Sequence, residues 1–162
     1  MISLRKTSFL IVFVSVLVIV PVPADAQKGG TDIAVVVNPN TPISGLTLAE
    51  VRQVFKGERQ YWPNNVPVVL IMRAPVSKER DVVLRTIFQM SDAQFKQYWV
   101  GKIFRAEATS APKVVYSNGV AAQILTAVPG AIAFMDAKDV TPGVKVIPVD
   151  GRLPGQANYP LR

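Results

Sequence analysis

The chain is 162 residues long, carries a formal charge of +7 and contains neither Cys nor His. That composition excludes disulfides, conventional zinc sites built on Cys or His, and Ser-His-Asp or Cys-His catalysis. The remaining carboxylates are scattered as single residues, so we expect a protein that is not an enzyme and uses no cofactor or metal.

The first 26 residues have the pattern of a secretory signal peptide. Arg5 and Lys6 form a positive start, residues 8–20 are apolar, and residues 24–26 form a small-x-small cleavage site. The apolar run is shorter than the roughly 20 residues of a membrane-spanning helix. We therefore expect cleavage after Ala26 and a periplasmic or secreted protein with no stable membrane span. An uncleaved N-terminal anchor is the alternative.

The first part of the mature chain predicts a strand followed by a capped helix. Residues 33–37 are a continuous apolar, β-branched run, which is typical of a buried strand. Residues 47–50 form a capping box, flanked by apolar residues at the two positions of a hydrophobic staple. Gly57 predicts the end of this helix. We interpret Tyr61 and Trp62 in the next segment as core and loop anchors.

The middle of the chain predicts a second strand and two further helices. Residues 66–72 read as a buried strand closed by Arg73, and Ser77 is placed to cap a helix. That helix is expected to bury Val83, Leu84, Ile87 and Phe88. A second capping box at residues 91–94 opens a helix that we expect to end by Gly101, followed by a loop anchored by Phe104.

The last part predicts three strands, one helix and an irregular tail. Strands are expected over 113–116, 131–135 and 144–149, with the tail beginning at Gly151. The helix opens at Ser117, and its expected inward residues are Val120, Ile124, Leu125 and Val128. Because strands alternate with helices, we expect one α/β domain over 27–162, with a mixed sheet flanked by helices.

Two strand-to-helix junctions predict a ligand site. In open α/β sheets, ligands lie beyond the carboxyl ends of strands, where helix N-termini accept oxyanions. The first junction supplies an arginine, which can grip an oxyanion bidentately, and a hydroxyl; the second supplies polar groups and a glycine. The candidate residues are Arg73, Ser77, Ser117, Asn118 and Gly119. Ordinary helix capping, and a surface ion pair for the arginine, are the alternatives.

Three segments also carry a family resemblance. Residues 46–57 with Trp62 are similar to a leucine-rich helix followed by phenylalanine, glycine and tryptophan. Residues 68–77 stand where the family pattern has a strand, an arginine and a Gly-Ser-Gly-Thr phosphate loop. Residues 119–134 are similar to a helix that begins with glycine and valine and is followed by Pro-Gly and a strand. Over nearly the whole mature chain, the sequence resembles the phosphate ABC transporter substrate-binding family. The resemblance implies a periplasmic-binding-protein type 2-like domain of half length.

The sequence departs from that family pattern at several positions. Val76, Lys78 and Glu79 replace the glycines and the threonine of the phosphate loop, and the Glu79 charge opposes phosphate. Ala133 and Phe134 replace a glycine and a tyrosine. The chain also begins near the middle of the full-length pattern. We therefore expect a one-sided site that binds weakly, because it does not enclose and desolvate the anion.

The predicted partner is anionic. Loss of Arg5, Lys6 and Asp25 with the signal peptide leaves a formal charge of +6. This charge favours binding to a small oxyanion, to lipid headgroups or to envelope polymers. A basic surface that only keeps the protein soluble is an equal alternative. The cations occur singly, so we expect no nucleic-acid binding.

These features favour an exported solute-binding-like protein with a weak site for phosphate or another oxyanion, and the resemblance implies an ABC permease as a partner. The alternative is an envelope protein–protein interaction module that kept the fold and lost the ligand. It would use the Trp62 loop, the aromatic helix over 95–99 and the basic surface. An enzyme that uses scattered carboxylates is the third hypothesis.

Overall fold

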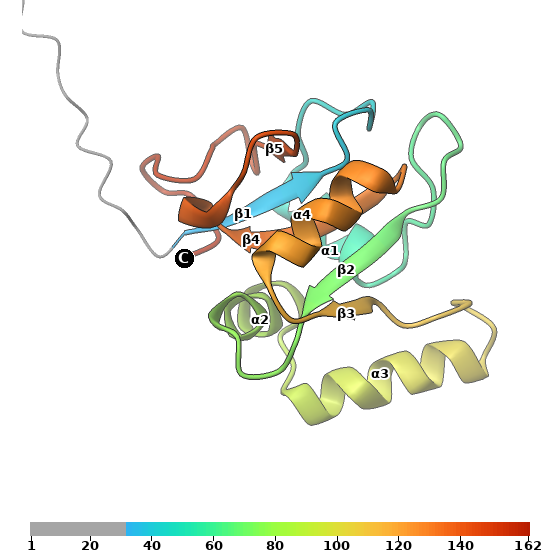
Figure 1. Cartoon of the computed structure of the whole chain (residues 1–162). Helices are drawn as coiled ribbons and strands as arrows, with labels where there is room; N and C mark the ends of the chain where they lie inside the picture. The colour runs from blue at the N-terminus through green and yellow to red at the C-terminus, as the bar shows by residue number, and fades with distance from the viewer. Residues whose placement is uncertain (1–31) are drawn as a thin grey trace, which may run out of the picture.

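A computed structural model describes residues 32–162, and Figure 1 shows its elements in chain order. The predicted signal peptide and its cleavage site lie outside the described residues. The elements are β1 (Ile33–Val37), α1 (Leu48–Phe55), β2 (Val69–Arg73), α2 (Lys78–Val83), the π-helical turn η1 (Leu84–Phe88), α3 (Asp92–Phe104), β3 (Lys113–Val115), α4 (Asn118–Ala127), β4 (Ala131–Asp136), the 3-10 turn η2 (Ala137–Asp139) and β5 (Lys145–Ile147).

The strands form one mixed sheet in the order β3-β2-β4-β1-β5. Strand β2 runs parallel to both of its neighbours, β3 and β4. Strand β1 runs antiparallel between β4 and β5, with Val35 opposite both Phe134 and Ile147. The predicted α/β fold with a mixed sheet and flanking helices is confirmed.

Strand β1 explains why its sequence is apolar at every position. Ile33, Val35 and Val37 belong to the larger apolar cluster, which also contains residues of α1, η1 and α3. Ala34 and Val36 face the smaller cluster beneath α4. Figure 1 shows α4 on one face of the sheet and α1 on the other. A strand covered on both faces has no solvent side, so it has no polar alternation.

The helix starts lie where the caps predict them. Thr47 with Glu50 and Ser91 with Gln94 both form complete capping boxes at α1 and α3. Gly57 follows the end of α1 with a φ of 68°, the left-handed conformation that glycine adopts without a steric penalty. These caps depend on residues three positions apart, so they can be read without knowledge of the tertiary structure.

The prediction that the third helix ends by Gly101 is wrong. Helix α3 continues to Phe104 and is closed by Ala106, which takes the left-handed conformation (φ 58°) without being a glycine. Phe104 is therefore the last helical residue, and it is 90% exposed. The proposal that Phe104 anchors a loop is also wrong, because the extra turn carries its ring away from the core.

Three further placements differ from the sequence-based expectation. Tyr61 is 54% exposed, whereas Trp62 is buried and its Nε1 donates to the Gly130 carbonyl at 2.9 Å. Val120 is 42% exposed, because α4 buries its alanine side instead. Strand β2 begins only at Val69, after Pro67, which forms an isolated antiparallel bridge with Tyr61 and has no backbone donor.

The tail after Gly151 is irregular, as predicted, but it is part of the core. Tyr159 and Leu161 are both buried. The Tyr159 hydroxyl donates to the Ile33 carbonyl at 2.8 Å, and the Ile33 N–H donates to the Leu161 carbonyl at 2.8 Å. Within residues 32–162, no helix has both the length and the apolar character needed to cross a membrane.

Candidate functional site

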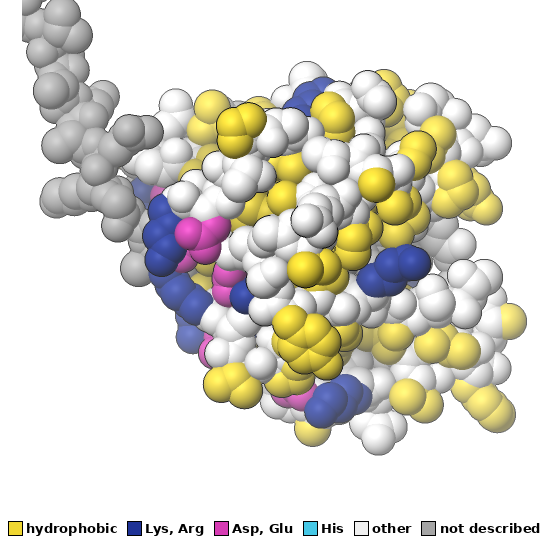
Figure 2. Space-filling model, in the orientation of Figure 1, with side chains coloured by type: hydrophobic (Ala, Val, Ile, Leu, Met, Phe, Trp, Pro, Cys, Tyr) yellow, Lys and Arg dark blue, Asp and Glu magenta, His cyan; other side chains and the backbone are white. Residues whose placement is uncertain are grey.

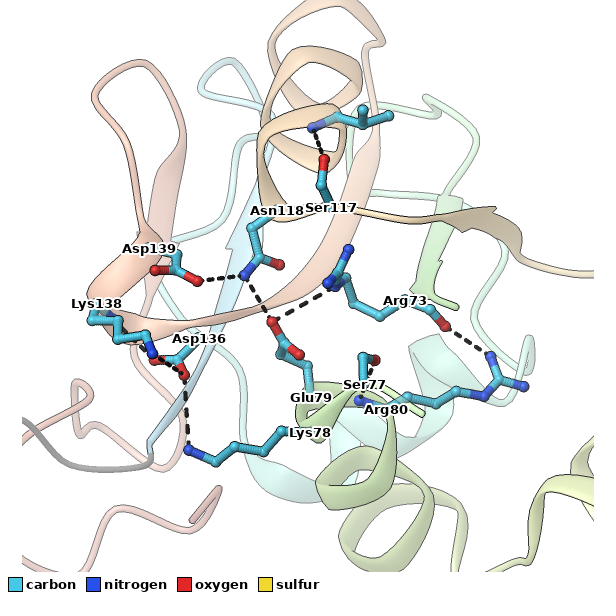
Figure 3. A network of polar contacts seen from close by, with 11 residues as sticks. Arg73, Ser77, Lys78, Glu79, Arg80, Ser117, Asn118, Asp136, Lys138 and Asp139 are labelled. Atoms are coloured by element: carbon cyan, nitrogen blue, oxygen red, sulfur yellow. Dashed lines mark hydrogen bonds and ion pairs between the residues drawn. The ribbon is translucent and has the colours of Figure 1, made fainter. Parts of the chain in front are cut away.

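The structure brings the two predicted strand-to-helix junctions together. Strand β2 ends at Arg73, which lies opposite Val115 in the parallel pairing with β3. The chain then turns from β3 into α4, so that Asn118 starts its helix beside the end of β2. Figure 3 shows both side chains pointing toward the same space. Parallel neighbours end at one edge of a sheet, and this is why segments distant in sequence meet here.

A carboxylate of the chain itself lies at the centre of this site. Asn118 Nδ2 donates to Glu79 Oε1 at 2.7 Å, and Arg73 Nε lies 3.6 Å from the same oxygen. Glu79 is only 6% exposed. The carboxylate is therefore held by the donors that the sequence assigns to an oxyanion ligand (Figure 3).

The site nevertheless retains unused hydrogen-bonding groups. Nε and Nη1 of Arg73 are buried and have no hydrogen-bond partner, because 3.6 Å is too long for a hydrogen bond. Asn118 Oδ1 is also buried and unpartnered. Leaving such groups unpaired costs about 1–3 kcal/mol each, so a molecule that supplied acceptors to Arg73 would gain from doing so.

The rim of the site balances its own charge. Asn118 Nδ2 also donates to Asp139 at 2.8 Å, and Asp136 lies 3.7 Å from Lys78 and 3.6 Å from Lys138. Around the site, three cationic side chains (Arg73, Lys78, Lys138) stand beside three anionic ones (Glu79, Asp136, Asp139). The excess positive charge of the whole chain is therefore not concentrated here.

The two candidate serines act as helix caps. Ser77 Oγ accepts from the Arg80 N–H at 3.3 Å, and Ser117 Oγ accepts from the Val120 N–H at 3.1 Å. Each hydroxyl hydrogen stays available to a ligand, so capping does not prevent a second role. Gly119 is open, since a Cβ there would meet nothing closer than Ser117 Oγ at 3.9 Å.

The loop between Arg73 and Ser77 contains a strained residue. Val76 has a φ of 70° and is 97% exposed. A β-branched side chain rarely adopts this left-handed conformation. The position is one at which the family resemblance implies a glycine, so the backbone keeps the glycine conformation although the residue is valine. Outliers of this kind occur most often at functional sites.

Sequence reasoning missed Arg80, which supports the site from beneath. Arg80 is buried, donates to the Arg73 carbonyl at 2.9 Å through Nη1, and pairs with Asp92 at 2.7 Å through Nη2. Its guanidinium also stacks on Phe95, 4.8 Å from the ring centroid. Asp92 lies on another helix, so no local spacing signals the pair.

Among the described residues, no group of acidic side chains could hold a metal ion.

The fold is similar to that of solved phosphate-binding proteins. An ABC-type phosphate transport receptor from Vibrio cholerae matches with a TM-score of 0.61 at 20% identity, over 76% of this chain and 48% of that one. A protein from Clostridium perfringens, assigned as a phosphate ABC transporter substrate-binding protein and solved with bound phosphate, matches with a TM-score of 0.59 at 20% identity, over 74% and 45%. PstS from Borrelia burgdorferi matches with a TM-score of 0.56 at 15% identity, over 76% and 49%.

These similarities establish the fold. The chain spans about half the length of each solved protein that it matches. No protein-family model matches the sequence, and no curated protein matches it. The resemblance to phosphate ABC transporter substrate-binding proteins, inferred from three sequence segments, is confirmed at the level of the fold.

Proposed function

We propose that this protein is an exported, non-enzymatic solute-binding-like protein that binds phosphate or a similar oxyanion weakly at the junction of Arg73 and Asn118. The observation that carries the proposal is the buried guanidinium of Arg73, whose Nε and Nη1 have no hydrogen-bond partner. The names of two solved proteins with similar folds support the proposal, since one is a phosphate transport receptor and the other was solved with bound phosphate. An ABC permease would be the partner of such a receptor.

Glu79 is the reason to expect weak binding. Its carboxylate already accepts from Asn118 and lies beside Arg73, so an oxyanion must compete with it for the same donors. Two like charges a few ångströms apart repel strongly in a partly buried site. Replacement of Glu79 by glutamine removes the charge but keeps an oxygen acceptor for Asn118, so it should strengthen phosphate binding.

Calorimetric titration with phosphate at low salt tests this proposal, with sulfate as the comparison anion. We expect the parent protein to bind phosphate weakly and saturably, and Arg73→Ala to show no binding. Glu79→Gln should bind phosphate about tenfold more tightly than the parent, because it removes one unfavourable charge contact of about 1.4 kcal/mol. Absence of saturable binding to both the parent and Glu79→Gln would overturn the oxyanion assignment. So would an Arg73→Ala protein that binds phosphate as well as the parent.

Export is a separate proposal that rests on residues 1–26. The mass of the protein recovered from the periplasm or medium should correspond to a chain that begins at Gln27. A membrane-bound protein that retains Met1 would instead support the uncleaved anchor.

Exposed apolar side chains favour a second function, an envelope protein–protein interaction module. Val76, Phe104 and Tyr116 are 97%, 90% and 83% exposed. Trp62 and Trp99, which belong to the segments that the sequence assigned to this function, are buried and so do not form its surface. Figure 2 shows yellow apolar side chains distributed over the face that carries α4 and β3. The position of the Glu79 carboxylate between Asn118 and Arg73 is consistent with this function, because an interaction module does not need to bind an anion there.

Crosslinking in the intact envelope separates the two functions. Under the interaction hypothesis, Tyr116→Ser should remove a specific crosslinked partner, whereas Leu153→Ser, a change at an exposed apolar residue of the C-terminal tail, should not. A crosslinking pattern unchanged by Tyr116→Ser and Phe104→Ser would argue against this second function and leave the oxyanion receptor.

A further inference from the structure

The cavity of this molecule lies away from the oxyanion site. It has a volume of about 300 Å³, and its walls come from the end of α1, the start of β2, the loop before β3 and the aromatic helix α3. This volume is at the lower end of the range for pockets that hold small molecules. The oxyanion residues Arg73 and Asn118 are not among its lining residues.

The cavity exists because the sheet opens at one edge. Strand β3 pairs with β2 only from Ile71 onward, so residues 67–70 of the β2 segment have no neighbouring strand on that side. The Val69 N–H donates to the Gly130 carbonyl on the opposite side, toward β4. The Leu70 N–H therefore faces the open side, one residue before the pairing of β2 with β3 begins at Ile71 and Lys113.

The Trp99 ring forms part of the cavity wall. The residue is 3% exposed, and its indole N–H is buried without a hydrogen-bond partner. The ring is fixed by edge-to-face contacts with Phe95 and Tyr98, at centroid distances of 6.4 and 5.7 Å. It also fills the space beside Gly57, where a Cβ would lie 3.0 Å from the ring. A buried indole usually finds an acceptor, so the signal of this N–H should be sensitive to small changes in the packing of the ring.

The charge around the cavity has one sign. Arg59 and Lys113 line it, and no lining residue is acidic. Lys113 forms no ion pair within residues 32–162. Arg59 lies 3.8 Å from Glu50, whose carboxylate is already engaged by Thr47 in the capping box at 2.8 and 2.9 Å. The Arg59 guanidinium also lies over the Trp62 ring, 5.7 Å from its centroid, so Lys113 is the lining cation that is left for an added anion.

We propose that this cavity binds a small organic monocarboxylate with an apolar body. The apolar body would contact the walls formed by Val54, Val68 and Trp99, and the carboxylate would meet the ammonium group of Lys113. This site is independent of the proposed oxyanion function, since a free phosphate offers no apolar surface to these walls.

Indole NMR signals provide a direct test with phenylacetate as the probe. The chain has two tryptophans, so the purified ¹⁵N-labelled protein gives two indole N–H signals, which Trp99→Phe assigns. Trp62 Nε1 is already bonded to the Gly130 carbonyl and serves as the internal reference. We expect phenylacetate to shift the Trp99 signal saturably and to leave the Trp62 signal nearly unchanged.

Two further ligands and two variants make the outcome decisive. Acetate lacks the apolar body and 2-phenylethanol lacks the charge, and each should bind at least about fivefold more weakly than phenylacetate. Lys113→Gln should weaken phenylacetate binding by about tenfold, since it removes one charge-assisted contact. Arg85→Gln, which changes an exposed cation outside the cavity lining, should have no effect. No saturable shift of the Trp99 signal, or equal binding of 2-phenylethanol, would overturn the proposal.

Discussion

Asn118, at the start of α4, donates a 2.7 Å hydrogen bond to Glu79, near the start of α2, and so joins two helices through residues 39 positions apart. Glu79 is buried, and its other close contact is an ion pair of 3.6 Å with Arg73. This hydrogen bond has a structural consequence that can be measured without any ligand.

Asn118→Ala should destabilise the protein by about 1–3 kcal/mol, because it leaves the buried Glu79 carboxylate without its hydrogen-bond donor. Urea unfolding measures the change as a shift of the midpoint at constant slope. Gln123→Ala is the matched control, since Gln123 is an exposed residue of the same helix and its loss should cost less than about 0.5 kcal/mol. Equal midpoints for the two variants would show that the hydrogen bond contributes nothing.

Val76→Gly should stabilise the protein, which is unusual for a change to glycine. The left-handed conformation of Val76 (φ 70°) costs about 1–2 kcal/mol for an L-residue, and the exposed side chain buries almost nothing that would be lost. The greater freedom of glycine in the unfolded chain offsets about 0.5–1 kcal/mol of this gain. A higher thermal midpoint for Val76→Gly is expected, and a lower one would show that the exposed valine makes contacts that its exposure does not reveal.

Gly130→Ala should prevent stable folding. Gly130 has a φ of 77°, and a Cβ there would lie 2.1 Å from the Pro67 carbonyl oxygen. Neither backbone segment can move without disturbing β2 or β4. Gly151→Ala is the matched control, with a similar φ of 72° but nothing within 4 Å of the added Cβ, so it should cost only the conformational term of about 1–2 kcal/mol.

The comparison is made by circular dichroism and urea unfolding of both variants. A Gly130→Ala protein as stable as Gly151→Ala would show that the close approach to Pro67 is not a constraint in solution.

Tyr159 should make stability fall at high pH. Burial, and then the nearby Asp32 carboxylate, raise the pKa of Tyr159 above its ordinary value of 10.0. Above pH 10 the unfolded chain loses this proton while the folded chain retains it. Deprotonation lowers the free energy of the unfolded state relative to the folded state, so stability decreases as pH rises.

Tyr159→Phe tests this dependence through urea unfolding at pH 8 and pH 11. At pH 8 the variant should lose about 1 kcal/mol, because its Ile33 carbonyl loses a donor. Between pH 8 and pH 11 it should lose less stability than the parent. Parallel losses in the two proteins would contradict the assignment of the alkaline sensitivity to this hydroxyl.

Much of the fold can be predicted from the sequence because its signals are local. The two capping boxes, the glycine after α1 and the apolar run of β1 each depend on residues within a few positions of one another. The prediction failed where a local signal was ambiguous. Gly101 resembles a helix end but lies inside α3, and Ala106 closes that helix in a conformation that its residue type does not signal.

For the site, the sequence identified the residues but not their partners. The spacing placed Arg73 and Asn118 at strand-to-helix junctions, and Glu79 was recognised as an opposing charge. The sheet order decided that Glu79 accepts from Asn118, since this contact depends on which strand ends lie side by side. The contact of Arg80 with the Arg73 carbonyl depends instead on how α2 packs against the end of β2.

The sequence by itself therefore determined the secondary structure, the fold class and the candidate residues, because backbone hydrogen bonding, capping and hydrophobic periodicity act over short distances along the chain. Only the tertiary structure decided which groups are buried together: the carboxylate inside the anion site, the tail tyrosine in the core and the open edge of β2 beside Trp99. Those outcomes depend on the packing of segments far apart in sequence, and no local pattern carries that information.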